Sequence, residues 1–304
     1  MMFDLKKKNI LVIGLGSSGG RYLEILKKMK FKNIFTLSKI KKNNLNSITS
    51  LDEIKTINPD FIFICSQTHH HFDQLKKINN LLKNKRILIE KPLFHQNFKL
   101  KNKKNKIFVG YNLRFHPVFK FLKKKINKNL NNFFELNLMC NSFLPNWRKG
   151  DYSKSYSAFS SCGGGVINDL SHEIDMALKL VGKIKIKKSY FNKLSDLKIN
   201  SEDNFFAFCK KKFNQKITID LNYYSLIEIR TIKFMCSKLG IIADFIKNEA
   251  TVSEKNKIKK INFNYKFDTY EMLVKDFIFN NGRNCASYED GLIVNKFIEK
   301  VKKK

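Results

Sequence analysis

The sequence predicts an α/β fold with an N-terminal doubly wound Rossmann domain and a C-terminal α+β domain that contains a large, mostly antiparallel sheet. Three observations support this. Apolar runs alternate with amphipathic stretches before residue 117, a glycine loop follows the first of these runs, and alternating aromatic-rich segments dominate after residue 117. The 304 residues suffice for two buried cores. We therefore expect domains at residues 1–117 and 118–304.

The first domain is predicted from short apolar strands separated by helices. The run at residues 61–64 is typical of a buried parallel strand, and residues 71–83 place apolar side chains at helical spacing. The predicted strands are residues 9–13, 33–37, 60–65, 86–90 and 106–109, and the predicted helices include 20–30 and 71–83. This rhythm predicts a doubly wound parallel sheet whose ligand binds at the carboxyl ends of the strands.

The second domain is predicted from segments in which apolar and polar residues alternate. Such alternation is typical of antiparallel strands with one exposed face. The segments are residues 133–139, 184–191, 204–209, 216–223, 229–235 and 258–265. One helix, opened by the glycines at 163–165, interrupts the series, and helices at 270–280 and 289–301 follow.

The composition limits the classes of partner. The formal charge of +33 comes almost entirely from lysine, which is spread along the chain among many Asn, Ile and Phe residues. This composition is typical of an AT-rich genome, and no RRM signature accompanies it, so we expect no nucleic-acid partner. A positive field would still attract anionic substrates or phosphates.

The cysteines and the apolar runs indicate the compartment. The six cysteines are scattered without CxxC or metal-ligand spacing, which favours structural thiols in a reducing compartment. No apolar run reaches the roughly 20 residues of a membrane helix. The first residues lead directly into the glycine loop, so we expect a strand there rather than a signal peptide. We therefore expect a soluble, cytoplasmic protein without a membrane partner or a metal.

The glycine loop predicts an anion site. Gly14, Gly16 and Gly19 stand between an apolar run and a helical pattern, with Ser17 and Ser18 at the expected helix start. Strand, tight turn and helix in this order place unsatisfied N–H groups against a pyrophosphate, and the glycines let the backbone approach it. A lysine, Lys91, follows the fourth predicted strand. Together these features suggest a dinucleotide and a group that handles a proton.

Five ordered motifs resemble those of the glucose–fructose oxidoreductase/inositol dehydrogenase/MocA (Gfo/Idh/MocA) oxidoreductase family. They are ICSQTHHH at 64–71, EKP at 90–92, GYNLRFHP at 110–117, GGGVINDLSHEID at 163–175 and YEDG at 288–291. Gln67 replaces the family's usual proline. The resemblance implies NAD(P)-dependent hydride transfer to or from a hydroxyl or carbonyl carbon.

The resemblance and the sequence context assign residues to the site. The expected cofactor-binding residues are Gly14, Gly16, Ser17, Ser18, Gly19, Ser38, Lys39, Ser66, Gln67, Thr68, His71, Glu90 and Lys91. The expected catalytic residues are Lys91, His172 and Asp169, and the expected substrate-binding residues are Asn112, Arg114, Trp147, Arg148, Tyr152, Asn168 and His172. His69 to His71 look like a metal tract, but adjacent residues in a turn point in different directions and lack matching partners.

The proposed chemistry uses Lys91 and His172. Histidine suits a base near neutral pH, and a partly desolvated lysine can polarise an oxygen and offset alkoxide charge. We expect both side chains to meet at the domain cleft. The family places an Asp four residues before the His, whereas here Asp169 is three before His172 and Asn168 is four before it. Which of the two takes the family's Asp position stays open.

The loop at residues 144–157 gives the substrate hints. Its Trp and Tyr side chains offer flat faces to a sugar, and Arg148 can pair with a carboxylate or phosphate. The alternative is a loop folded onto its own aromatic residues. The segment is similar to one in family members that modify sugars and sugar nucleotides for surface polysaccharides. We therefore expect a sugar or sugar-nucleotide substrate, with an anionic one favoured.

The cofactor and assembly are also predicted. No acid follows the second strand, where Ser38 and Lys39 stand instead, so NADP is tolerated and slightly favoured over NAD. We expect a homodimer or homotetramer through the C-terminal sheet. The alternatives are a nicotinamide-assisted glycoside hydrolase or lyase, a reductase of a non-sugar small molecule, and a basic nucleic-acid-binding protein that retains an unused Rossmann domain.

Overall fold

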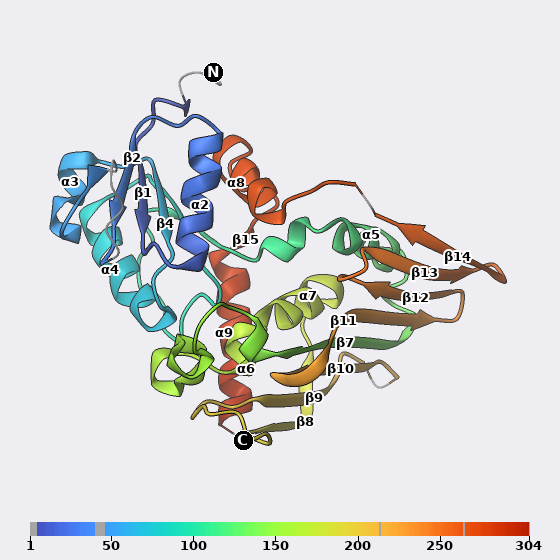
Figure 1. The fold of residues 1–304 in the computed structure, drawn as a ribbon. Helices are drawn as coiled ribbons and strands as arrows, with labels where there is room; N and C mark the ends of the chain where they lie inside the picture. The colour runs from blue at the N-terminus through green and yellow to red at the C-terminus, as the bar shows by residue number, and fades with distance from the viewer. Residues whose placement is uncertain (1–4, 40–45, 213, 264, 304) are drawn as a thin grey trace. The chain divides into compact units, whose positions relative to one another are not determined.

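The structure, a computed structural model, describes residues 5–39, 46–212, 214–263 and 265–303 (Figure 1). The chain forms two compact units. Unit 1 contains Met1–Asn112 and Phe267–Asn295, and unit 2 contains Leu113–Lys266 and Lys296–Lys304. This division differs from the predicted single boundary after residue 117, because a late segment of the chain packs with the first one.

Unit 1 is built on a seven-stranded sheet in the order β15-β6-β5-β4-β1-β2-β3. The strands are β1 (Ile10–Ile13), β2 (Ile34–Leu37), β3 (Asn46–Ser47), β4 (Phe61–Ile64), β5 (Arg86–Ile89), β6 (Lys106–Val109) and β15 (Ala286–Ser287). All pairs are parallel except β15 with β6. The order reverses beside β1, where a doubly wound sheet binds its ligand. The predicted Rossmann fold is confirmed.

Helices cover both faces of this sheet. Figure 1 shows α2 (Ser17–Lys28) and α8 (Thr269–Phe279) side by side on one face, with α3 (Ile54–Ile57) and α4 (His71–Leu81) on the other. Short 3₁₀ turns are Leu51–Glu53 and Thr68–His70. Helix α8 is held by Phe277, whose ring packs edge-on against Phe61, Phe63 and Phe108. This aromatic contact explains why the late segment belongs to unit 1.

Unit 2 is built on an eight-stranded sheet in the order β14-β13-β12-β11-β7-β10-β9-β8. The strands are β7 (Phe133–Phe143), β8 (Lys185–Asn192), β9 (Asn204–Lys210), β10 (Lys216–Asn222), β11 (Tyr224–Cys236), β12 (Leu239–Asp244), β13 (Glu249–Glu254) and β14 (Lys257–Asn262). Only the pair β7–β10 is parallel, so the predicted mostly antiparallel sheet is confirmed. Residue 264 of the predicted strand 258–265 lies outside the described residues.

The sheet of unit 2 has one covered and one open face. Helices α5 (Pro117–Asn127) and α7 (Ser171–Val181) lie on the covered face (Figure 1), and the short α6 (Val166–Asp169) precedes α7. Alternate strand residues such as Leu136, Leu138 and Ile232 are buried there. On the other face Glu135 pairs with Lys216 at 2.9 Å and Lys233 at 3.0 Å.

The remaining described elements are the 3₁₀ turn Asn112–Phe115, the last helix and four further short turns. Helix α9 (Tyr288–Lys302) begins in unit 1 and ends in unit 2. The four further turns, all 3₁₀, are Leu144–Asn146, Tyr152–Lys154, Tyr156–Ala158 and Ser160–Cys162, between β7 and α6. Among the described residues, no helix combines the length and the apolar character that crossing a membrane requires.

Candidate functional site

Gly14, Gly16 and Gly19 of the unit 1 loop differ in what a side chain at each position would contact. Gly14 has a φ of 84°, and a Cβ there would meet the Cys65 carbonyl oxygen at 2.8 Å. A Cβ on Gly19 would lie 1.8 Å from the Gly14 carbonyl oxygen. A Cβ on Gly16 would meet no atom within 4 Å. The fold therefore requires glycine at 14 and 19, whereas Gly16 borders open space beside the helix start.

That open space lies at the N-terminus of α2. Gly16 is the N-cap, in an extended conformation with a φ of −65°, and Ser17 and Ser18 are the first helical residues. The first turn contains no acidic side chain that would repel an anion. The amides of a first helical turn have no partners within the helix, and the helix dipole adds positive potential. The site therefore fits a pyrophosphate group.

The end of β2 lies next to the same loop. The Ser38 hydroxyl accepts a hydrogen bond from the Leu15 amide at 3.3 Å, which ties the end of β2 to the glycine loop. Lys39 is exposed. Burial, followed by the charges of His69 and Lys39, lowers the pKa of His70. The basic group Lys39 thus lies within electrostatic reach of the turn after β4.

His71 connects the loops after β4 and β5. Its ring is buried, with Nε2 3.0 Å from the Ser66 carbonyl oxygen and Nδ1 3.2 Å from the carbonyl oxygens of both Pro92 and Leu93. Burial lowers the pKa of His71 to about 4, so the ring is neutral at pH 7. In the same turn the Ser66 hydroxyl donates to the Gln74 side chain at 2.7 Å, and Thr68 is buried. His71 therefore holds the backbone of the loop after β4 close to the backbone of the loop after β5.

The EKP segment contains one buried and one accessible ionisable residue. Glu90 is buried and accepts a hydrogen bond from the Tyr22 hydroxyl at 2.6 Å, and burial raises the pKa of Glu90. A Cβ on Gly110 would lie 2.9 Å from Glu90 Oε1, so glycine at 110 leaves room for this carboxyl. Lys91 is partly exposed at the carboxyl end of β5. Lys91 is thus accessible to a ligand, whereas Glu90 fastens the strand end to α2.

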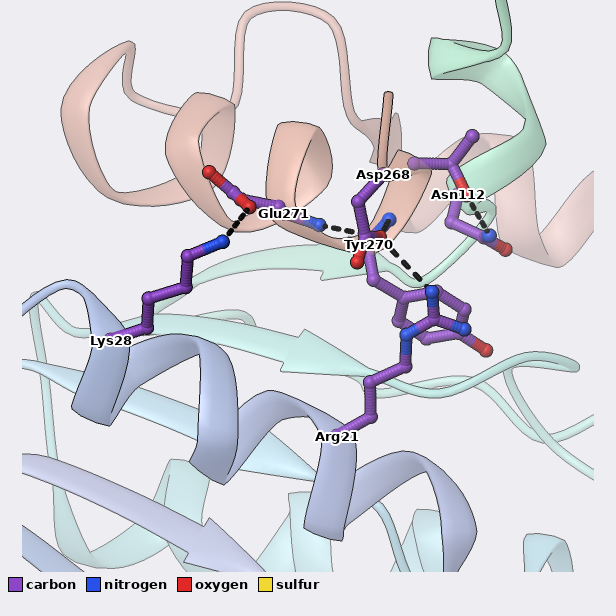
Figure 2. Close-up of polar contacts among 7 residues, drawn as sticks. Arg21, Lys28, Asn112, Asp268, Tyr270 and Glu271 are labelled. Atoms are coloured by element: carbon purple, nitrogen blue, oxygen red, sulfur yellow. Dashed lines mark hydrogen bonds and ion pairs between the residues drawn. The ribbon is translucent and has the colours of Figure 1, made fainter. Parts of the chain in front are cut away.

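Asn112 has a contact within unit 1 that sequence reasoning missed. Its side-chain amide donates to the Thr269 hydroxyl at 2.7 Å, at the start of α8 (Figure 2). Asn112 is buried. The predicted substrate role of Asn112 stays a prediction, and the observed contact joins the end of the N-terminal segment to the returning segment of unit 1.

The polar centre of unit 2 is Asp169. Its carboxylate accepts hydrogen bonds from the Tyr156 hydroxyl and from the Tyr223 hydroxyl, the latter at 2.6 Å. Burial, and then the Asp169 charge, raises the pKa of both tyrosines, so both remain donors at neutral pH. The neighbouring Asn168 instead donates to the Gly163 carbonyl oxygen at 3.0 Å. Asp169 therefore faces the polar side chains, and Asn168 holds the glycine turn.

The prediction of one continuous helix after the glycines is wrong. Helix α6 ends at Asp169 and α7 begins at Ser171, because Leu170 has a φ of −96° and a ψ of 26°. Counting three or four residues back from His172 along a single helix therefore does not decide which side chain lies near it. His172 is buried in the first turn of α7.

The loop between β7 and α6 contributes two predicted residues to the Asp169 region. Trp147 packs edge-on against Tyr223 with ring centroids 5.1 Å apart, and its indole N–H donates to Ser142 at 3.1 Å. The Arg148 guanidinium lies over the Tyr156 ring, 5.2 Å from its centroid. Both loop residues thus contact a tyrosine that binds Asp169. Tyr152 lies elsewhere, since its hydroxyl accepts from the Lys198 amide at 3.1 Å.

Arg114 is engaged in a buried ion pair. Its guanidinium contacts both oxygens of Asp175, at 2.8 Å and 2.5 Å, and the two side chains are 4% and 2% exposed. A buried, bidentate pair compensates both charges within the protein. The assignment of Arg114 to substrate binding stays a prediction, while the observed contact joins the segment before α5 to α7.

Two residues of the Asp169 region were missed. Tyr223 is the last residue of the predicted strand 216–223, and nothing in its spacing marks it as a partner of Asp169. Glu202 precedes β9, and burial raises the pKa of its carboxyl to about 7. A Cβ on Gly165, whose φ is 109°, would lie 2.1 Å from Glu202 Oε1. The third glycine of the turn therefore makes room for a carboxyl that comes from a remote part of the sequence.

The described residues contain no grouped metal ligands, and one surface hollow lies away from the predicted site residues. Among residues 5–39, 46–212, 214–263 and 265–303, no three His, Cys, Asp or Glu side chains are grouped so as to hold a metal ion. A hollow at the hairpin end of the unit 2 sheet is lined by Met235–Gly240, Ser253–Asn256 and three neighbours. None of the predicted site residues lines it.

Comparison with solved structures shows the fold of the whole chain. UDP-N-acetylglucosamine 3-dehydrogenase GnnA from Acidithiobacillus ferrooxidans has a TM-score of 0.76 at 16% identity, covering 97% of this chain and 96% of its own. The WlbA dehydrogenase from Bordetella pertussis, in complex with NADH and UDP-GlcNAcA, has a TM-score of 0.75 at 14% identity, covering 98% and 96%. At these identities the likeness concerns the fold.

A third solved structure has the same fold, and part of the chain matches a known family. Levoglucosan dehydrogenase, in complex with NADH and levoglucosan, has a TM-score of 0.79 at 16% identity, covering 98% of this chain and 97% of its own. No curated protein matches the sequence. Residues 8–108 match the family described as "Oxidoreductase family, NAD-binding Rossmann fold". This match confirms, over residues 8–108, the resemblance to the Gfo/Idh/MocA oxidoreductases that the motifs predict.

Proposed function

We propose that the protein is an NAD(P)-dependent oxidoreductase that transfers a hydride between nicotinamide and a hydroxyl or carbonyl carbon of a sugar or sugar nucleotide. The observation that carries the proposal is the open space beside Gly16 at the start of α2, within a segment that belongs to an NAD-binding family. Three proteins of the same fold are dehydrogenases named for a sugar or nucleotide-sugar substrate or bound to one, which supports this substrate class.

The cofactor would supply the hydride chemistry, and the protein supplies binding, orientation and proton handling. We assign the pyrophosphate to the amides at the start of α2, with Gly16 admitting its close approach. Lys91 would polarise the substrate oxygen, since an ammonium group offsets developing negative charge. His172 would take or return the hydroxyl proton. Asp169, held by two tyrosines, supplies a fixed negative charge in unit 2.

The substrate assignment rests on the Asp169 region. Trp147, which is partly exposed and packs against the buried Tyr223, provides an aromatic face of the kind that stacks on sugar rings, and Arg148 provides a cation. Arg148 suits a carboxylate or a phosphate. We therefore favour an anionic sugar or a nucleotide-linked sugar, with surface-polysaccharide biosynthesis as the process served.

Native mass spectrometry of the purified protein tests this function. We expect co-purified NAD(H) or NADP(H), released as a defined mass on denaturation. Reduction of added NAD or NADP, followed at 340 nm with a panel of UDP-sugars, UDP-sugar acids and free sugars, should identify the substrate class. Cleavage of a glycoside without net formation of NADH would instead indicate a nicotinamide-assisted hydrolase or lyase.

Two finer features belong to the same proposal. Ser38 and Lys39 stand where an acidic residue would repel a 2′-phosphate, so we propose that NADP(H) is accepted and slightly preferred. A tenfold lower Kd for NADH than for NADPH would contradict this preference. We also propose a homodimer or homotetramer through the open face of the unit 2 sheet, which light scattering of the purified protein would test.

A further inference from the structure

The returning segment of unit 1 reaches the first turn of α2. Helix α8 begins after Asp268, whose carboxylate caps it by accepting from the Tyr270 amide at 2.8 Å. Arg21 of α2 contacts the same carboxylate at 3.2 Å, and Lys28 contacts Glu271 at 3.3 Å (Figure 2). Two cationic side chains of α2 therefore fasten α8, one near the glycine loop and one at the far end of the helix.

Tyr270 lies at the loop end of this contact. The Arg21 guanidinium stacks over its ring, 4.4 Å from the centroid, as Figure 2 shows. The Tyr22 ring meets it edge-on with centroids 5.4 Å apart. The Ser18 side chain is near enough to the Tyr270 hydroxyl to lower its pKa, against a larger rise from Glu90 and burial. Tyr270 thus faces three residues of the first turns of α2.

These three residues share one side of the helix start. Arg21 and Tyr22 follow Ser18 by three and four positions, which makes their side chains neighbours on the helix surface. Helical side chains tilt toward the N-terminus, so Arg21 leans toward the turn that borders Gly16. The Arg21 side chain is 50% exposed, and its contact with Asp268 uses one of its five N–H groups. The other N–H groups can donate to an incoming anion.

We propose that Tyr270 and Arg21 extend the dinucleotide site, with Arg21 binding the diphosphate directly and Tyr270 acting as a positioning residue that orients both Arg21 and the Ser18 hydroxyl. This inference rests on the proposed function of the glycine loop and adds a contribution from the returning segment. Arg21 would add a side-chain cation to the backbone amides of the turn. The cofactor site of unit 1 would then be incomplete without residues 267–279.

Calorimetric titration of the full chain with NAD and with ADP-ribose, which both contain the diphosphate, tests the inference. We expect Arg21→Met to raise both Kd values about tenfold or more, because it removes a charge-assisted hydrogen bond. We expect Tyr270→Phe, which keeps the stacked ring and removes only the hydroxyl, to raise them about three- to tenfold. Ser18→Ala probes the same contact from its other end.

Lys28→Met is the matched control. It removes the second of the two ion pairs described between α2 and α8, far from the glycine loop, and should change Kd less than twofold. Equal losses in Lys28→Met and Tyr270→Phe would show that only helix docking matters and would overturn the inference. Unchanged affinity in Arg21→Met and Tyr270→Phe, with normal binding by the unmodified chain, would overturn this inference but leave the proposed function standing. No binding of either ligand by the unmodified chain would overturn the proposed function as well.

Discussion

The glycine loop of unit 1 and the glycine turn of unit 2 use glycine in different ways. In unit 1 the restricted glycines meet main-chain atoms: Gly14 lies against Cys65, and Gly19 against Gly14. In unit 2 Gly164 also meets main-chain atoms, but Gly165 makes room for the Glu202 side chain, and the nearby Asp169 is bound by Tyr156 and Tyr223. The first arrangement is defined by a short motif, whereas the second depends on side chains from distant parts of the chain.

The largest effect is expected at the two proposed reacting groups, one in each unit. Lys91→Ala and His172→Ala should each lower kcat by about two to four powers of ten, the range of a positioned acid–base group. Kd for NAD should change little, because neither residue is assigned to the diphosphate. If both act in one step, the double variant should lose much less than the product of the single losses. Steady-state kinetics at saturating cofactor measures this, and full multiplicativity would argue against a shared step.

Gly19, which the fold requires, and Gly16, which borders open space, should respond differently to the same substitution. Gly19→Ala places a Cβ 1.8 Å from a carbonyl oxygen and should lower the free energy of unfolding by at least about 2 kcal/mol. Gly16→Ala places it in open space and should change that free energy by about 0.5 kcal/mol or less. Urea unfolding of the two variants measures these changes in the free energy of unfolding. Equal destabilisation would remove the distinction between the glycines.

The tyrosine contacts of unit 2 should affect turnover moderately. Tyr223→Phe removes one donor to Asp169, and we expect kcat to fall about tenfold, as for the loss of one hydrogen bond to a charged group. Tyr224→Phe is the matched control, since the neighbouring hydroxyl donates to Asn204 at 2.9 Å and not to Asp169. A similar loss in both variants would indicate a general effect on the end of β10 and β11.

A smaller effect concerns pH, and it affects one histidine in each unit. Burial lowers the pKa of both His71 and His116 to about 4, below the ordinary value of 6.5. The unfolded chain therefore binds more protons between pH 6.5 and 4, so their stabilising contribution is full above pH 6.5 and is lost as the pH falls toward 4. Each histidine contributes at most about 1.4 kcal/mol per pH unit to the slope.

His116→Asn tests this dependence at one site. His116 Nδ1 caps α5 by accepting from the Val118 amide at 3.2 Å, and asparagine keeps a capping acceptor that does not titrate. Urea unfolding between pH 4.5 and 7 should show a shallower loss of stability in the variant. If the free energy of unfolding depended on pH equally in the variant and the unmodified chain, the pKa of His116 would be the same in the folded and unfolded chain.

The sequence predicts what short-range patterns encode. Strands β1 and β4 of unit 1 are apolar and buried on both faces, so their runs of Ile, Val, Leu and Phe are distinctive. Strands β12 and β13, which precede the predicted β14, were missed, because Asn248, Lys255 and Asn256 adopt positive φ where a glycine would have marked a turn. Helix α5 was missed although Pro117 at its first position is a helix-start signal.

Long-range placement could not be read from the pattern. The amphipathic residues of 270–280 predict a helix with an apolar face but do not say which sheet covers that face. The return of α8 to unit 1 depends on the contact of Phe277 with three phenylalanines that are remote in sequence. The partners of Asp169 were missed for the same reason. The cofactor-loop residues lie within a few positions of one another, and their grouping was therefore predictable.

The most direct test of the central claim is calorimetric binding of NAD(H) and NADP(H) to Gly16→Val beside the unmodified chain. A Cβ at 16 would meet no atom within 4 Å, so the variant should unfold at nearly the same urea concentration. The same side chain would occupy the space through which a diphosphate approaches the backbone, so cofactor binding should be lost. A stable variant with unchanged affinity for both cofactors would contradict the assignment of this loop as the dinucleotide site.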